Sequence, residues 1–257
     1  MTRLLEIVRA AAAPWGLNLV AALSVTRYEA AGAAPATVEA ITQLGARSII
    51  VVANGGGDFW RAYTRYADVR RGWLERPDPL DDFTRAIVED TLAPAVRRAA
   101  GITCTPVYPF ASDPPQLNFM QLGRLAGLAG PSIIGVVVHP VYGPWLAFRA
   151  ALLVDVVLDV PGAALGFDPC PTCVARSCIT GCPAEAVSNE HGWDLAGCLK
   201  FRVEQEPACA PRCHARAACV LGPEYRYPDA ELAYHQRRAL KVMRPYYEAH
   251  LRPRRND

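Results

Sequence analysis

Residues 170–183 read CPTCVARSCITGCP, and residues 198–219 read CLKFRVEQEPACAPRCHARAAC. These two stretches contain eight of the nine cysteines in the 257-residue chain. The first has the spacing C-x2-C-x4-C-x3-C-P, and in the second an isolated cysteine precedes C-x3-C-x5-C. Packing alone does not explain cysteines grouped at such short intervals, so the pattern indicates a metal centre.

Closely spaced cysteines that end in Cys-Pro are typical of ferredoxin-like domains. In these domains three thiolates of one run bind one [4Fe–4S] cluster, and the fourth cysteine of each run binds the other cluster. The crossing rule predicts two clusters here. Because the spacing of the second run is looser than usual, the alternative is one cluster and an incomplete second site. The first set is Cys170, Cys173, Cys178 and Cys219, and the second set is Cys182, Cys198, Cys209 and Cys213.

Three other roles for these cysteines compete with iron–sulfur binding. Disulfides need an oxidising compartment, and residues 1–6 lack the basic flank and long apolar core of a signal peptide. Structural zinc prefers paired C-x2-C knuckles, of which the chain has one, although His214 beside Cys213 keeps zinc open as an alternative. Buried structural thiols are the weakest explanation for eight clustered cysteines.

Charge and hydropathy favour a soluble cytoplasmic protein without a nucleic-acid or membrane partner. The formal net charge is +2 and 20% of the residues are charged, which gives no electrostatic argument for either partner. The longest apolar stretch, residues 147–160, is interrupted by Arg149 and Asp155 and is too short to span a bilayer. The last stretch is locally basic and is interpreted as a solvated helix face with a frayed tail, in preference to an RNA contact: its residues are Arg237, Arg238, Lys241, Arg244 and Arg252 to Arg255.

Hydrophobic periodicity and turn residues predict a mixed α/β order before the cysteines. Helices are expected at residues 2–13, 35–44, 81–100, 116–128 and 229–251, and strands at 17–25, 47–53, 102–108 and 133–138. The apolar stretch at 145–160 is expected to be one more strand or a buried hairpin arm. The glycine loop at residues 54–58 is either a phosphate cradle, a tight connection or a passage of backbone past a ligand. The expected domains are an α/β domain (1–162), a dicluster domain (163–224) and a C-terminal helix and tail (225–257).

The stretch before the cysteines resembles the cobalamin-dependent epoxyqueuosine reductases, which are relatives of the reductive dehalogenases. The resemblance rests on PFASDPP at residues 109–115, RLAGL at 124–128 and HPVYGPW at 139–145. In that family a loop aspartate precedes an AGLG helix end, a glycine, an apolar strand and a GS or GP turn, followed by a dicluster motif. Roughly residues 45–220 share this order.

The resemblance implies a nitroreductase-like α/β domain that binds base-off cobalamin, with two [4Fe–4S] clusters that feed electrons to cobalt. It implies an electron donor of the flavodoxin or ferredoxin type. Asp113 would be the general acid, and an apolar loop around its carboxyl would raise the pKa by desolvation. The alternative is that Asp113 caps the next helix. The candidate cofactor-binding residues are Tyr108, Ser132, Gly135, Tyr142 and Gly143.

Departures from the family favour a small-molecule substrate over transfer RNA. The family's GLGWxGK has no counterpart, since residues 130–136 lack both Trp and Lys, and no helical-repeat extension follows the clusters. The sequence therefore predicts an iron–sulfur, cobalamin-dependent reductase of small molecules. A cobalamin-processing protein and a plain ferredoxin-type electron carrier are the alternatives.

Overall fold

A computed structural model describes residues 2–252, so the end of the basic tail, residues 253–257, lies outside the described residues. The chain divides into two compact units. The first consists of Met1–Gly130 and Leu146–Phe167, and the second of Pro131–Trp145 and Asp168–Asp257. The segment Pro131–Trp145 thus groups with the cysteine region, whereas the sequence placed it in the α/β domain. The division at residues 162 and 224 stays a prediction.

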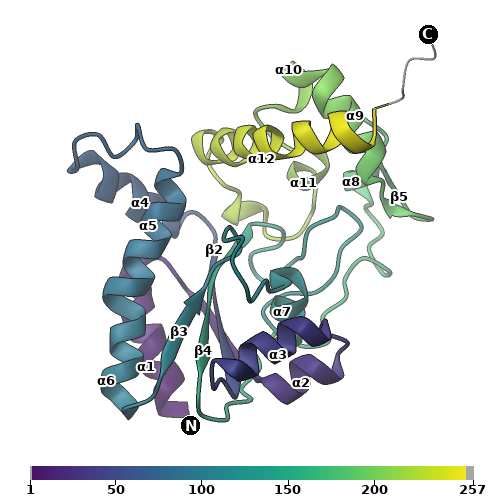
Figure 1. Ribbon diagram of the computed structural model, residues 1–257. Coiled ribbons are helices and arrows are strands. Elements are labelled where there is room, and N and C mark those ends of the chain that lie inside the picture. The colour runs from purple at the N-terminus through teal and green to yellow at the C-terminus, as the bar shows by residue number, and fades with distance from the viewer. Residues whose placement is uncertain (1, 253–257) are drawn as a thin grey trace. The chain divides into compact units, whose positions relative to one another are not determined.

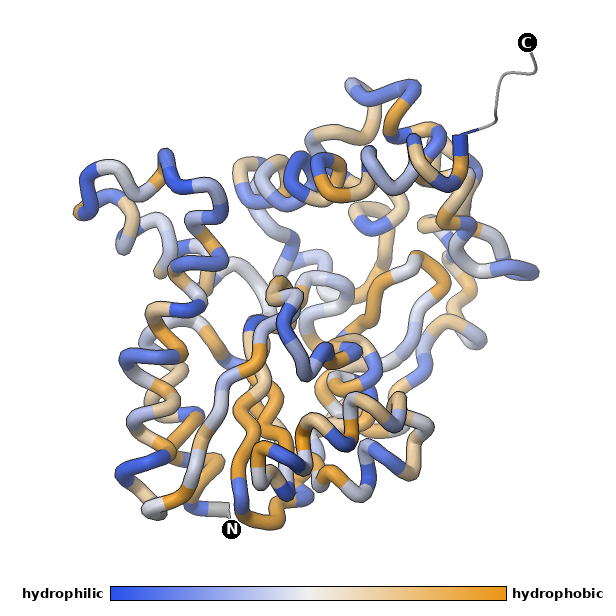
Figure 2. Tube along the Cα trace, in the orientation of Figure 1, coloured by the Kyte–Doolittle hydropathy of each residue, from blue (hydrophilic) through white to orange (hydrophobic). Residues whose placement is uncertain are grey.

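The first unit is built on a four-stranded antiparallel sheet in the order β1-β2-β4-β3 (Figure 1). All eight residues of β2 are buried, because apolar β-branched side chains fill both faces of this central strand. Figure 2 shows the resulting apolar centre of the unit. The strands are β1 (Leu19–Ser24), β2 (Ser48–Gly55), β3 (Cys104–Val107) and β4 (Leu146–Val154).

Helices cover both faces of this sheet. Figure 1 shows α1, α5 and α6 on one side of the sheet and α2, α3 and α7 on the other. The helices of the unit are α1 (Thr2–Ala12), η1 (Ala13–Trp15), α2 (Val25–Ala30), α3 (Pro35–Gln43), α4 (Asp58–Asp68), α5 (Pro79–Ile87), the π-helical η2 (Val88–Leu92), α6 (Ala93–Ala100) and α7 (Phe119–Leu125). The fold is mixed α/β, as the sequence predicts. None of the described helices is long and apolar enough to cross a membrane.

The strand predicted at residues 133–138 is wrong. The backbone turns there because Gly135 has a left-handed φ of +74° and because Ser132 Oγ hydrogen-bonds to the Val136 carbonyl and the Ile134 amide. Ile134 is buried in the core of the second unit with Val187 and Ala215. The apolar residues that predicted a strand therefore serve as core contacts of a loop.

Short elements make up most of the second unit, and one long helix ends it. Trp145, Tyr227 and Leu232 form one buried cluster of this unit, which ties the start of the long helix to the segment before β4. The elements are α8 (Ser177–Thr180), β5 (Val187–Ser188), β6 (Gly192–Trp193), α9 (Leu195–Glu204), α10 (Glu206–Cys209), α11 (His214–Ala217), η3 (Pro223–Tyr225) and α12 (Asp229–His250).

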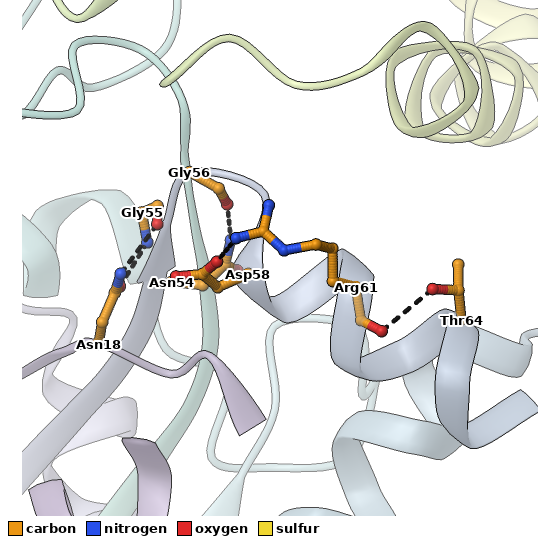
Figure 3. A network of polar contacts seen from close by, with 7 residues as sticks. All are labelled: Asn18, Asn54, Gly55, Gly56, Asp58, Arg61 and Thr64. Carbon is orange, nitrogen blue, oxygen red and sulfur yellow. Dashed lines mark hydrogen bonds and ion pairs between the residues drawn. The ribbon is translucent and has the colours of Figure 1, made fainter. Parts of the chain in front are cut away.

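The glycine loop after β2 is held by side chains of its own unit (Figure 3). Asn18 bonds both to the Gly55 amide, at 2.8 Å, and to the Gly55 carbonyl, at 2.9 Å. Asn54 donates to the Gly56 carbonyl at 3.2 Å. A Cβ at Gly16 would overlap the backbone of Asp58. These contacts support a tight connection. They weaken the phosphate-cradle alternative, because the Gly55 amide that would bind a phosphate already donates to Asn18.

Replacing Asn54 by alanine is expected to destabilise the first unit by about 1.5–3 kcal/mol. Arg149 is buried, and its Nε donates to Asn54 Oδ1 at 2.7 Å, so the substitution removes an acceptor from a buried cation. Urea unfolding measures the change. The double variant Asn54→Ala, Arg149→Met serves as the control, since removing the cation as well should recover part of the loss. Strict additivity of the two substitutions would contradict the interpretation.

Candidate functional site

The first set of cysteines lines one cavity of the second unit. The cavity has a volume of about 310 Å³, and its wall includes Cys170, Cys173, Cys178 and Cys219. Cys170 and Cys173 lie in one turn, where the Cys173 amide donates to the Cys170 carbonyl at 3.2 Å. Cys178 lies in α8, and Cys219 follows α11. Cys178 and Cys219, which are 41 positions apart in sequence, thus line the same cavity.

The second set lines a separate cavity of the same unit. Its volume is about 240 Å³, and its wall includes Cys182, Cys198, Cys209 and Cys213. Cys182 follows α8, Cys198 lies in α9, Cys209 ends α10 and Cys213 precedes α11. The structure therefore gathers the eight cysteines into two groups of four, in the grouping that the crossing rule gives.

Two short helices, α8 and α11, lie close together at their C-terminal ends and are flanked by cysteines of both cavities. A Cβ at Gly181 would lie 2.8 Å from the Ala218 side chain, so a larger residue at position 181 would push the helices apart. Each helix is flanked by cysteines of both sets: α8 contains Cys178 and precedes Cys182, and α11 follows Cys213 and precedes Cys219. The close contact fixes the spacing of both groups.

Burial and neighbouring thiols make one cysteine of each set, Cys178 and Cys209, hard to ionise without a cation. Burial raises the pKa of Cys178, and the nearby Cys219, Cys170 and Cys173 raise it further. Burial, together with Cys213, Cys198 and Cys182, raises the pKa of Cys209 to about 11. Four thiolates are stable at one place only when a positively charged group compensates them, as iron does in a cluster.

Within residues 2–252 the cysteines form no site for a single metal ion. Among the described residues, no three or more His, Cys, Asp or Glu side chains converge on a single metal ion. A [4Fe–4S] cube does not require such convergence, because each thiolate binds a different iron at the edge of a cavity. The zinc alternative also loses support, because Nε2 of His214 already lies 2.8 Å from the Ala208 carbonyl. All nine cysteines are free thiols, including the buried Cys104 of β3.

Sequence reasoning missed two residues of the second cavity, Trp193 and Arg202. Burial raises the pKa of Cys198, while a hydrogen bond from Trp193 and the charge of Arg202 lower it. The signal for Arg202 was present, since it follows Cys198 by four residues on one helix and so lies on the same face. Trp193 carried no comparable signal, because its place depends on the β5–β6 hairpin.

Four predicted cofactor-binding residues lie in the second unit, near the cysteine cavities. Ser132 lines the first cavity and Gly135 lines the second, where a Cβ would overlap the Trp193 ring. Gly143 lies so close to Leu221 that a Cβ would overlap its carbonyl. Tyr142 packs edge-on against Tyr225. Contacts within this unit account for these positions, and their role toward a corrin stays a prediction.

His139 stabilises the turn that contains Tyr142. Its Nδ1 accepts hydrogen bonds from the amides of Val141 at 3.0 Å and Tyr142 at 3.2 Å. Burial lowers the pKa of His139, which favours the neutral ring that these bonds require. The histidine is therefore a hydrogen-bonded turn residue, and it is not counted among the candidate metal ligands.

Tyr108 and Asp113 lie in the first unit, on the wall of a cavity of about 430 Å³. The Tyr108 hydroxyl donates to Glu89 at 3.2 Å, and the Arg85 guanidinium lies 4.7 Å from the Tyr108 ring centre. Burial, strengthened by Glu89, raises the pKa of Tyr108. This cavity brings together an aromatic wall and charged groups of both signs.

Two expectations about Asp113 are wrong. Its side chain is exposed, so the apolar loop does not desolvate the carboxyl as predicted. It does not cap the next helix either, because α7 begins only at Phe119 and the Asn118 side chain accepts from the Gln121 amide at 3.1 Å. The helix starts later than the sequence suggested, and its cap moves with it. Asp113 is left as an exposed acid on a cavity wall.

Comparison with known proteins identifies the fold. No protein-family model and no curated protein matches the chain. Among solved structures, epoxyqueuosine reductase from Streptococcus thermophilus matches with a TM-score of 0.58 and 13% identity, over 89% of this chain and 68% of that one. A C. elegans B12-trafficking protein, CblC, matches with a TM-score of 0.57 and 15% identity, over 95% of this chain and 96% of that one.

A catabolic reductive dehalogenase, NpRdhA, matches with a TM-score of 0.54 and 18% identity, over 94% of this chain but only 35% of the dehalogenase. At such identities the likeness concerns the fold. The chain therefore has the fold that epoxyqueuosine reductase, CblC and the reductive dehalogenase share, as the resemblance in sequence predicted at this level.

Proposed function

We propose that the protein is an iron–sulfur, cobalamin-dependent oxidoreductase that acts on a small molecule. The observation that carries this proposal is the division of eight cysteines into two cavities of four, in a chain with the fold of epoxyqueuosine reductase and CblC. The proposal includes an electron donor of the flavodoxin or ferredoxin type. It also includes a cytoplasmic location, where thiols stay reduced.

Two [4Fe–4S] clusters would be held by the two sets, Cys170, Cys173, Cys178 and Cys219, and Cys182, Cys198, Cys209 and Cys213. The clusters supply one-electron transfer, and cobalamin supplies a cobalt centre that reacts with the substrate. The chain's own contribution is to keep the thiols of each set together and largely out of water. In the second set Trp193 also donates a hydrogen bond to Cys198, which favours the thiolate.

The first-unit cavity is the proposed site for the small molecule, with Asp113 as the proton donor on its wall. Arg85 and Arg97 on this wall offer positive charge to an acidic ligand, and the Tyr108 ring offers it a flat apolar surface. Burial and the bond to Glu89 raise the pKa of Tyr108, so its hydroxyl is a weak acid and is proposed to line the site while Asp113 donates the proton.

A cobalamin-processing role is the second candidate. It is favoured by the mutual coverage with CblC, in which 95% of this chain matches 96% of the other. A processing protein would bind the corrin as its substrate and would not need Asp113 as an acid. The two candidates therefore differ in what the loss of that carboxyl does.

Anaerobic titration of the iron-loaded protein with cob(II)alamin, followed by electron paramagnetic resonance, tests both candidates. The proposal predicts a base-off cobalt signal without nitrogen splitting from a lower ligand. Asp113→Asn should leave this signal unchanged and abolish turnover of any substrate found, whereas a processing protein would keep its activity. Intact clusters with no cobalt binding would contradict both candidates.

A further inference from the structure

The walls of the two cysteine cavities carry different amounts of positive charge. The second cavity is lined by two arginines, Arg202 and Arg216, and, within residues 2–252, by no acidic side chain. The first has one basic residue on its wall, Arg176, which is only half-buried and donates to the Pro171 carbonyl at 3.3 Å. Solvent screens a partly exposed charge far more than a buried one.

Arg202 is the most deeply buried of these cations, with 8% of its surface exposed. Its Nη2 donates to the Gln236 carbonyl at 3.0 Å, and its Nη1 lies 3.5 Å from the Met243 sulfur. The Nε atom is buried and finds no hydrogen-bond partner among the described residues. A guanidinium buried in this way is stabilised by an anion nearby, and the charge of Arg202 acts on two cysteines of the second set, Cys198 and Cys209.

The side chain is held at this place by the helix that also presents a cysteine. Arg202 follows Cys198 by four residues in α9, so both side chains lie on one face of the helix, one turn apart. Both line the same cavity. Lys200, on the same helix, is exposed and does not line it. Of these two basic residues of α9, only Arg202 shares the cavity with the thiolates.

A charge at this position acts on the redox balance of a cluster. A [4Fe–4S] cube with its four thiolates is an anion, and it gains a further negative charge on one-electron reduction. A buried cation therefore stabilises the reduced form more than the oxidised form and raises the reduction potential. The hydrogen bond from Trp193 to Cys198 acts in the same direction.

We infer that Arg202 makes the second cluster the higher-potential member of the pair, so that an electron shared between the clusters rests on the second. The inference rests on the two clusters of the proposed function. One electron enters the first cluster from the flavodoxin- or ferredoxin-type donor and moves to the second cluster. The first cluster is thereby oxidised again and the second reduced, with no proton transferred. Arg202 is a tuning residue that acts through its charge on the second cluster.

A potentiometric titration of the iron-loaded protein, with the reduced clusters followed by electron paramagnetic resonance, tests the inference. The wild-type protein should show two one-electron steps. Arg202→Gln should weaken electron binding at one step at least tenfold, which is 59 mV for a one-electron couple, and should shift the other step less. The step whose potential shifts should be the step that is still present in Cys178→Ala, because that variant retains the second set of cysteines.

Two further variants separate charge from packing. Arg202→Lys keeps the cation and should retain the wild-type order of the two potentials, even if Arg202→Gln fails to assemble the second cluster. Lys200→Gln removes a positive charge from the exposed part of α9 and should leave both steps in place. A reversed order in Arg202→Lys, or an equal shift in Lys200→Gln, would overturn the inference.

The failure of the inference is distinguishable from that of the proposed function. Two clusters in the wild type with unchanged potentials in Arg202→Gln would overturn the role of Arg202 and leave the dicluster proposal standing. A single cluster in the wild type, by iron content and spin count, would overturn the second cluster and the inference with it.

Discussion

Replacing Cys178 by alanine is expected to remove about half of the iron that the reconstituted protein binds. Cys178 shares its cavity with Cys170, Cys173 and Cys219, and a cube that loses one of four thiolates loses a bond to one of its irons. The second cavity contains none of these residues, so its cluster should remain. Iron analysis and the absorbance near the sulfur-to-iron charge-transfer bands measure the loss.

The same substitution in the second set is the complement of this experiment. Cys213→Ala should also remove about half of the iron, and the double variant should bind almost none. Cys104→Ala is the matched control, because Cys104 is a buried thiol of β3 in the first unit and lines neither cavity. Complete iron loss in Cys178→Ala with unchanged folding would show that the two sets do not bind separate clusters.

Gly143→Ala is expected to lower the free energy of unfolding of the second unit by about 2–5 kcal/mol. Two costs add at this position. Its φ of +56° is a left-handed conformation that alanine adopts with strain, and the new Cβ would overlap the carbonyl of Leu221. Leu221 lies two residues after Cys219, so the displacement should also reduce iron binding by the first set.

Gly192→Ala separates these two costs. Gly192 belongs to the same unit and also has a positive φ, +66°, but a Cβ there would meet no atom within 4 Å. Its substitution should therefore cost only the conformational strain, about 1 kcal/mol, and leave iron binding unchanged. Both proteins are compared by urea unfolding and iron content. Equal losses in the two variants would show that the contact of Gly143 with Leu221 does not matter.

The sheet and its helices were predictable because their signals are local. Residues 47–53 form an apolar β-branched run, and the structure has β2 at Ser48–Gly55. The helix predicted at residues 81–100 is present as α5, η2 and α6. Its π-helical turn at Val88–Leu92 was not foreseen, because a single inserted residue barely disturbs the helical spacing of apolar residues.

Features that depend on tertiary contacts escaped the sequence. Ile133 to Val138 has the composition of a strand, yet it is a loop whose apolar side chains pack in the second unit. Asp113 precedes two prolines in a pattern typical of a cap, but the helix begins after Asn118. Local composition cannot show which unit a loop packs in or where a helix starts when several polar residues compete to cap it.

The cysteine sets, by contrast, were predicted from ligand chemistry, and their binding of clusters stays a prediction. The crossing rule assigns the fourth cysteine of each run to the other set, and the two cavities contain those groups. The charge around each group was not foreseen, since Arg202 and Trp193 become neighbours of Cys198 only through helix geometry and a hairpin. The cysteine positions are thus read from spacing, whereas their electrostatic surroundings depend on packing.

The most direct test of the account is transfer of an electron from the clusters to cobalt. The iron-loaded protein is reduced anaerobically, freed of excess reductant and mixed with cob(II)alamin, and the cluster and corrin absorbances are followed together. The account predicts that the clusters are oxidised in step with formation of cob(I)alamin, and that the Cys178→Ala, Cys213→Ala double variant forms none. Reduced clusters that persist beside bound, unreduced cob(II)alamin would contradict it.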